Sequence, residues 1–171
     1  MSILKDLNSK YRIDASKSAS SDEEIKKMIE FADVQIPEDF IEVIKELSEI
    51  EINVDGKKYI RIWGADGCIE MNAAYSIQEN MPNSFAIADD EGGNALIYTT
   101  GQNGFGLYVI AFNDLDVDEL QYVAGSLSDL LINNTGIDVI KNSCQFHCVA
   151  FSLLLNTDLW LGIIWLFNWC V

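Results

Sequence analysis

Apolar side chains recur every three or four residues in two early stretches, which is the spacing of amphipathic helices. The first stretch follows Ser21, and Glu24 three residues later completes a capping-box pattern, so we expect a helix from Asp22. The second begins at Pro37, which suits the first turn of a helix, and two acids after it complement the positive helix end. The apolar positions are Ile25, Met28, Ile29 and Ala32 in the first helix and Phe40, Ile41, Ile44 and Leu47 in the second.

Beyond residue 51 the apolar period shortens to two, as in half-buried strands. Residues 52–54 and 60–62 alternate around Asp55-Gly56, a dipeptide that favours the positive φ angles of a type I′ hairpin turn. Asn103-Gly104 is a second turn signal. We therefore expect hairpins, with further strands at 85–88, 94–100 and 105–112.

Three other stretches complete the outline. Residues 69–79 predict a helix that Pro82 ends, and residues 116–133 predict two short helical pieces, the second starting at Ser126. Residues 1–20 are polar and serine-rich, so we expect a flexible leader there. Helices combined with tight hairpins predict an α+β fold with a central, mostly antiparallel sheet of about five strands flanked by helices.

The charge of the chain limits the classes of partner that it can bind. The 171 residues fit one domain, and 49% of them are hydrophobic, yet the net charge is −16 and the pI is near 4.1. Phosphate contacts need Lys and Arg, so nucleic acid is excluded as a direct ligand, and anionic lipid is disfavoured for the same reason. An acidic surface suits a basic protein partner, although on charge alone the simpler explanation is that it only keeps the protein soluble.

Composition also divides the chain near residue 142. Residues 21–142 form the acidic domain, whereas residues 143–171 hold one charged side chain, Asp158. The apolar stretch 149–171 is long enough to span a bilayer, but a central Asp costs about 2.5–3.5 kcal/mol there. Three interpretations stay open: a membrane anchor, an element packed on the domain, or an adventitious C-terminus such as a shifted reading frame would give. Because no signal-peptide pattern is present, we expect a cytoplasmic protein.

Two acidic clusters are candidates for binding chemistry. Asp89, Asp90 and Glu91 precede Gly92-Gly93, but their spacing does not match a calcium loop, and a hairpin turn with acids facing water is the better interpretation. The second cluster alternates like the start of an EF-hand loop but lacks the glycine and glutamate that the loop needs, so it predicts a helix N-terminus. This second cluster comprises Asp114, Asp116 and Asp118.

Nothing in the sequence points to an enzyme, and we expect no metal and no cofactor. The single histidine, His147, lies in the tail with Cys144 and Cys148, which is a weak basis for zinc. The glycines of 101–106 do not follow the spacing of a phosphate-binding loop. A carboxylate-based hydrolase would need two acids that face each other across a cleft.

Four motifs, in this order, make the chain resemble the SUKH superfamily over about residues 22–135. They are Ile36-Pro37-Glu38, the strand from Ile60 to Trp63, the acidic-glycine turn from Ala88 to Asn94, and the helix around Ala124–Leu131. In this last motif leucine occupies both aromatic positions of the family pattern, and the tail has no counterpart in it. The resemblance implies an α+β fold and a non-enzymatic protein that binds and neutralises a cognate toxin of a bacterial polymorphic toxin system. The alternative is an intracellular regulatory or scaffold protein, as among the fungal members.

Together, charge and resemblance suggest an immunity protein that binds a basic toxin, which a nuclease would fit. We expect its contacts in the two acidic clusters, Asp89, Asp90, Glu91, Asp114, Asp116 and Asp118. The oligomeric state is not indicated.

Overall fold

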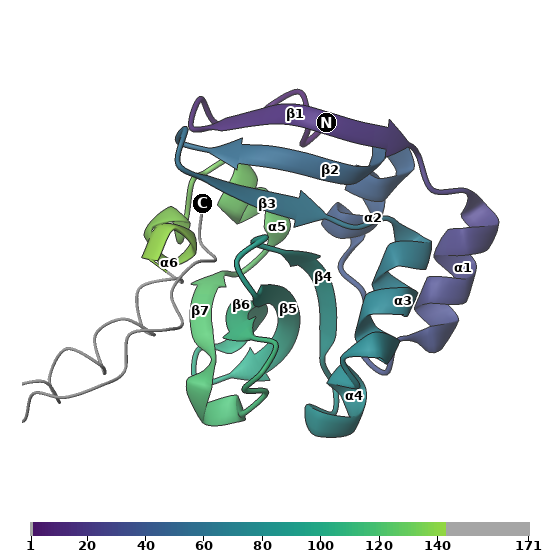
Figure 1. The fold of residues 1–171 in the computed structure, drawn as a ribbon. Coiled ribbons are helices and arrows are strands. Elements are labelled where there is room, and N and C mark those ends of the chain that lie inside the picture. Colours follow the sequence, from purple (N-terminus) through teal and green to yellow (C-terminus); the bar gives the residue numbers. More distant parts are fainter. Residues whose placement is uncertain (1, 143–171) are drawn as a thin grey trace, which may run out of the picture.

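The computed structural model describes residues 2–142 (Figure 1). The apolar tail 143–171, its three interpretations and the cluster around His147 lie outside the described residues. Within residues 2–142, no helix combines the length and the apolar character that crossing a membrane requires.

The structure is built on one seven-stranded sheet, in which every neighbouring pair is antiparallel and the strands follow one another in chain order. Figure 1 shows that the sheet curls, with β1–β3 along one side and β5–β7 turned below them. The strands are β1 (Tyr11–Ser18), β2 (Leu47–Val54), β3 (Lys58–Ile62), β4 (Phe85–Asp89), β5 (Asn94–Gly101), β6 (Gly104–Ala111) and β7 (Gln121–Ala124).

Helices occupy three of the connections between strands, and two more helices follow β7. α1 and α3 lie side by side at one flank, and α6 lies beside the β2–β3 turn (Figure 1). The helices are α1 (Asp22–Phe31), α2 (Glu38–Glu46), α3 (Ala65–Ala74), α4 (Ile77–Asn80), the 3-10 helix η1 (Val117–Glu119), α5 (Leu127–Leu131) and α6 (Ile137–Asn142).

The core lies between the sheet and the helices that cover it. Tyr98 of β5 is fully buried, and its hydroxyl accepts a hydrogen bond of 2.9 Å from the backbone N–H of Leu127 at the start of α5. Asp39 of α2 accepts a bond of the same length from the N–H of Ser128. These bonds fix α2 and α5 against β5, while side chains such as Phe40 stabilise the packing by about 1.5–3 kcal/mol each.

The expected α+β fold is confirmed, and so are three of its local signals. Ser21 and Glu24 form the capping box of α1, and Ser126 caps α5. Asp55 and Gly56 adopt φ angles of +55° and +70° in the β2–β3 turn, as their sequence predicted. The predicted helix 69–79 is divided into α3 and α4, because Ser76 interrupts it with φ of +49°.

The count of five strands was too low by two. Residues 11–18, assigned to a flexible leader, form β1 and pair with β2. Only Tyr11 and Ile13 of this edge strand pack on the core, so its polar residues concealed the strand pattern. Residues 121–124, expected to be helical, form β7, a strand too short to show a period of its own.

Candidate functional site

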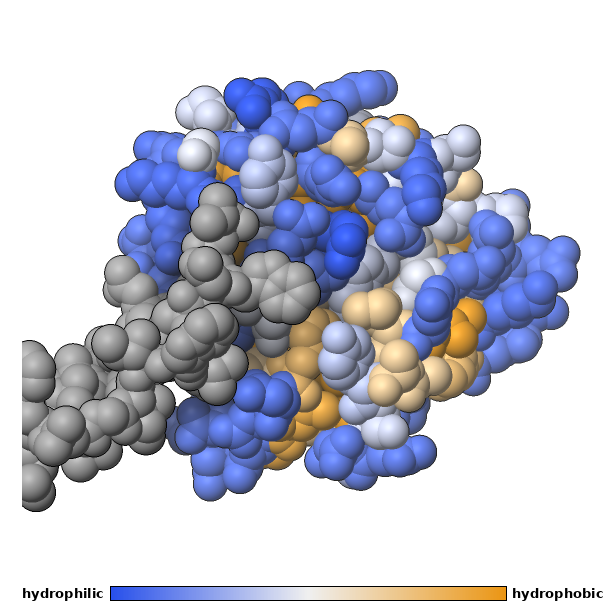
Figure 2. Space-filling view, in the orientation of Figure 1, coloured by the Kyte–Doolittle hydropathy of each residue, from blue (hydrophilic) through white to orange (hydrophobic). Residues whose placement is uncertain are grey.

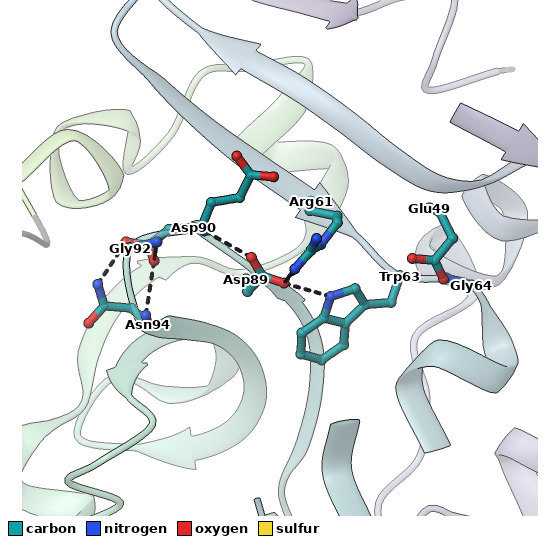
Figure 3. A network of polar contacts seen from close by, with 9 residues as sticks. Glu49, Arg61, Trp63, Gly64, Asp89, Asp90, Gly92 and Asn94 are labelled. Carbon is teal, nitrogen blue, oxygen red and sulfur yellow. Dashed lines mark hydrogen bonds and ion pairs between the residues drawn. The ribbon is translucent and has the colours of Figure 1, made fainter. Parts of the chain in front are cut away.

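The turn between β4 and β5 is held from within by Asp90. One carboxylate oxygen accepts hydrogen bonds from the N–H groups of Gly92 and Asn94, at 2.8 and 2.9 Å, and the other accepts one from the Asn94 amide at 2.7 Å (Figure 3). Positive φ angles fall on Glu91 and Gly93, at +54° and +99°, and not on Gly92. The local hydrogen bonds of Asp90 therefore define the shape of the turn.

Asp89, at the end of β4, ties this turn to β3. Its Oδ2 accepts hydrogen bonds from Arg61 Nη2 and Trp63 Nε1, both at 2.8 Å, and its Oδ1 accepts one from the N–H of Glu91 (Figure 3). The hydrogen bond to Asp89 raises the pKa of Arg61. The side chain of Asp89 is 5% exposed and that of Arg61 is 40% exposed, so this ion pair reaches from the interior to the surface.

The structure corrects the expectation that both aspartates of the turn face water. Asp89 and Asp90 are buried, and their oxygens are engaged in the bonds just described. Glu91 is exposed. A short acidic run followed by glycines is typical of a turn exposed to solvent. The spacing of the residues does not show which carboxylates point into the protein, so the burial of Asp89 and Asp90 was not predicted.

The second predicted cluster lies on the β6–β7 connection, residues 112–120. Asp114, Asp116 and Asp118 are all exposed. Asp116 caps η1 by accepting a hydrogen bond of 3.0 Å from the N–H of Asp118, so the expected role at a helix N-terminus is confirmed for this residue.

The fold brings the two clusters to the same end of the sheet. Asn94 at the start of β5 pairs with Ala111 at the end of β6, and the N–H of Phe112 donates to the carbonyl oxygen of Gly93 at 3.0 Å. The β4–β5 turn and the β6–β7 connection are thus neighbours, although the eighteen residues of 94–111 separate them in sequence.

Sequence reasoning missed a group of three aromatic side chains at this end, here named the aromatic ladder: Trp63, Phe112 and Tyr75. The ring of Phe112 stacks on that of Tyr75 with 4.0 Å between centroids, and on that of Trp63 with 6.5 Å. Trp63 is 2% exposed, whereas Tyr75 is 41% exposed. The three residues come from separate elements, so no local spacing could have revealed the ladder.

Charges are distributed unevenly along the chain. Between Arg61 and Lys141 the sequence contains twelve acidic residues and no lysine or arginine. This span includes β4 to β7 and both acidic clusters. All lysines and arginines of the sequence lie at or before Arg61, except Lys141 of α6. The part of the chain that forms β4 to β7 is therefore strongly negative, and Arg61, the last basic residue before it, is paired to Asp89.

A shallow groove of about 630 Å³ lies elsewhere, between β1 and the starts of α1 and α3. Its carboxylates come from Glu24, Glu49 and Asp66. Glu24 accepts the capping bond from Ser21, and Glu49 accepts one from the N–H of Gly64 at 3.0 Å. Among residues 2–142 no group of three or more His, Cys, Asp or Glu side chains is arranged to hold a metal ion.

Cys68 is the one cysteine within the described residues. It is fully buried in α3, and this burial raises the pKa of its thiol well above the ordinary value. A thiol that is both protonated and inaccessible is a poor nucleophile.

The comparison with models of protein families places residues 19–133 in the SMI1 / KNR4 family (SUKH-1). The match includes the capped start of α1, the β3 strand with Trp63, the acidic-glycine turn and α5. No significant match to a curated protein was found.

Proposed function

Because this chain belongs to the SMI1 / KNR4 family (SUKH-1), we propose that it is an immunity protein that binds a cognate toxin in the cytoplasm and neutralises it. SUKH membership supports binding to a protein partner in general, and the family is generally non-catalytic. That the partner is a toxin, and that this toxin is basic, is what the proposal adds to family membership.

The observation that carries the proposal is the charge distribution. Twelve acids without a single lysine or arginine between Arg61 and Lys141 give half of the domain a one-signed field. Such a field accelerates encounter with a basic protein and repels nucleic acid and anionic lipid. A nuclease toxin suits this field, because the surface with which it binds phosphates is basic, and an acidic protein can occupy that surface in place of its substrate.

Within this proposal the predicted contact residues have two roles. Glu91, Asp114, Asp116 and Asp118 are exposed and would contact the toxin directly. Asp89 and Asp90 are buried and would act by holding the turn that presents Glu91.

Co-expression tests the proposal. The product of the gene beside this one is expressed in a bacterial host, alone and with the full chain, and growth is followed together with the amount of both proteins. We expect growth to stop with the toxin alone and to be restored with the chain present. Undiminished toxicity at full expression of the chain would contradict the proposal. A neighbouring gene without toxicity, together with a stable complex between the chain and a cellular protein, would favour the regulatory alternative.

A further inference from the structure

The aromatic ladder is a supported apolar surface, not a loose side chain. Trp63 at its base is fixed by the hydrogen bond to Asp89, and Phe112 in the middle is fixed through its backbone to Gly93. Only Tyr75, at the C-terminal end of α3, is largely exposed, at 41%. A partner that contacts the Tyr75 ring would therefore meet a pre-organised face and lose little side-chain freedom in ordering it.

Other exposed apolar groups lie on the elements that join at the ladder. Val117 of η1 is 55% exposed, and it belongs to the β6–β7 connection that begins at Phe112. Figure 2 shows apolar side chains gathered on the lower half of this face, between β7 and α4, while the part over β1–β3 is mostly hydrophilic. Protein interfaces have this arrangement, an apolar centre with aromatic residues and a polar rim.

Acids border the ladder along the chain on both sides. Glu70 lies on α3, the helix that leads to Tyr75, and is exposed. The β6–β7 connection contributes Asp114, Asp116, Asp118 and Glu119, all exposed. Arg61 is the nearest base in sequence to the ladder, and Asp89 already pairs with it.

We propose that the aromatic ladder and the acidic β6–β7 connection form one docking surface for a basic protein, with Tyr75 as the central apolar contact. An aromatic or apolar side chain of that partner can pack on the exposed Tyr75 ring while arginines beside it pair with Asp114, Asp116 and Asp118. A second copy of this chain would bring the same negative charge to the interface and is repelled. This inference rests on the proposed function, since it names the surface that the toxin would occupy.

Two peptides of equal charge can probe the surface without the toxin. The first repeats Arg-Trp-Arg-Leu three times, and the second repeats Arg-Ser-Arg-Ser three times. Each is titrated into the full-length, isotope-labelled chain at physiological salt, and the NMR shifts of the backbone amides are followed. We expect the first peptide to bind about tenfold more tightly than the second, because only its Trp and Leu side chains add an apolar contact with the Tyr75 ring. Its shift changes should concentrate on residues 63, 75 and 112–119.

Variants separate the apolar contact from charge. Tyr75→Ala should remove the preference for the first peptide, while Phe105→Ala is the matched control. Phe105 is also an exposed aromatic residue, at 45%, but it lies in the β5–β6 hairpin at the opposite end of the sheet. The triple variant D114N/D116N/D118N should weaken both peptides and leave their ratio unchanged. Circular dichroism confirms that each variant is folded.

The outcomes distinguish this inference from the proposed function. Equal affinity for the two peptides, shift changes centred on another surface, or an unchanged preference in Tyr75→Ala would overturn the docking surface. In the co-expression assay, a toxin that is neutralised as well by Tyr75→Ala and by D114N/D116N/D118N would overturn the surface and leave the immunity function intact. A chain that binds the peptide as expected but gives no protection would contradict the immunity function alone.

Discussion

The indole Nε1 of Trp63 donates a hydrogen bond of 2.8 Å to the carboxylate of Asp89, across the pairing of β3 with β4. The same carboxylate oxygen accepts from Arg61, and the other one accepts from the N–H of Glu91. A single buried side chain thus joins an aromatic core residue, a surface cation and the acidic-glycine turn. Removing the Asp89 side chain should therefore disturb the Trp63 ring, the Arg61 side chain and the acidic-glycine turn.

Replacing Asp89 with alanine should destabilise the fold strongly. Arg61 would lose its partner and Trp63 Nε1 would be buried without an acceptor. We expect a loss of roughly 2–4 kcal/mol in the free energy of unfolding, somewhat less than is usual for a buried pair because Arg61 is 40% exposed. Urea denaturation followed by tryptophan fluorescence measures it.

Asp14 is the matched control for this variant. It also pairs with an arginine, Arg12, but on the exposed edge strand β1, where the arginine side chain is 73% exposed. Asp14→Ala should cost less than about 1 kcal/mol, as is usual for surface ion pairs. Equal losses in the two variants would show that the buried network contributes nothing beyond a surface pair.

Gly136 should tolerate no side chain, because a Cβ at this position would meet the carbonyl oxygen of Val123 in β7 at 2.1 Å. Its φ of +74° adds backbone strain. Gly56 has a similar φ of +70° with open space around it. We expect Gly56→Ala to cost about 1 kcal/mol from strain alone and Gly136→Ala to cost at least about 3 kcal/mol. Thermal unfolding of both variants measures these losses of stability. Equal losses in the two variants would contradict this account.

The attachment of α6 to the β2–β3 turn should depend on pH. Hydrogen bonds from Lys141 and Lys10 lower the pKa of Asp55 from 3.8 to about 2. Because the folded pKa is lower than the unfolded one, this contribution to stability is present above about pH 4 and is lost as the pH falls to 2. Wild type should therefore be more stable than Asp55→Asn at pH 6, and the difference should shrink between pH 4 and pH 2. A difference that stays constant over that range would exclude Asp55 as its source.

Charge on the β6–β7 connection should govern the rate of association with a basic toxin. D114N/D116N/D118N should slow binding several-fold, up to about tenfold, and should reduce its salt dependence. Stopped-flow mixing at several salt concentrations measures both quantities. The control triple variant D22N/E23Q/E30Q removes the same charge from exposed positions of α1. If both variants slow binding equally, only net charge matters and the position of the acids does not.

Local signals in the sequence predicted most of the fold. The caps at Ser21 and Ser126 and the turn at Asp55-Gly56 act within a few residues, so sequence spacing is sufficient to find them. Strands β1 and β7 were missed because an edge strand has only one partner, and a four-residue strand has almost no period.

The candidate site was only partly predictable for a related reason. That the two acidic clusters share one end of the sheet depends on the pairing of β5 with β6, which sequence spacing does not determine. The inward orientation of Asp89 depends on Arg61 and Trp63, 28 and 26 residues earlier. The aromatic ladder likewise needs Tyr75 and Phe112 to meet in space.

The agreement between strand order in the sheet and strand order in the chain has a consequence during synthesis. When a strand from β2 onward leaves the ribosome, the neighbouring strand with which it pairs has already been synthesised. The helices between β1 and β2 and between β3 and β4 are the two longest interruptions. In a meander of this kind each new strand can pair with the strand synthesised before it. The unpaired edge of the sheet is then always the newest strand, and β7 with α6 completes the sheet.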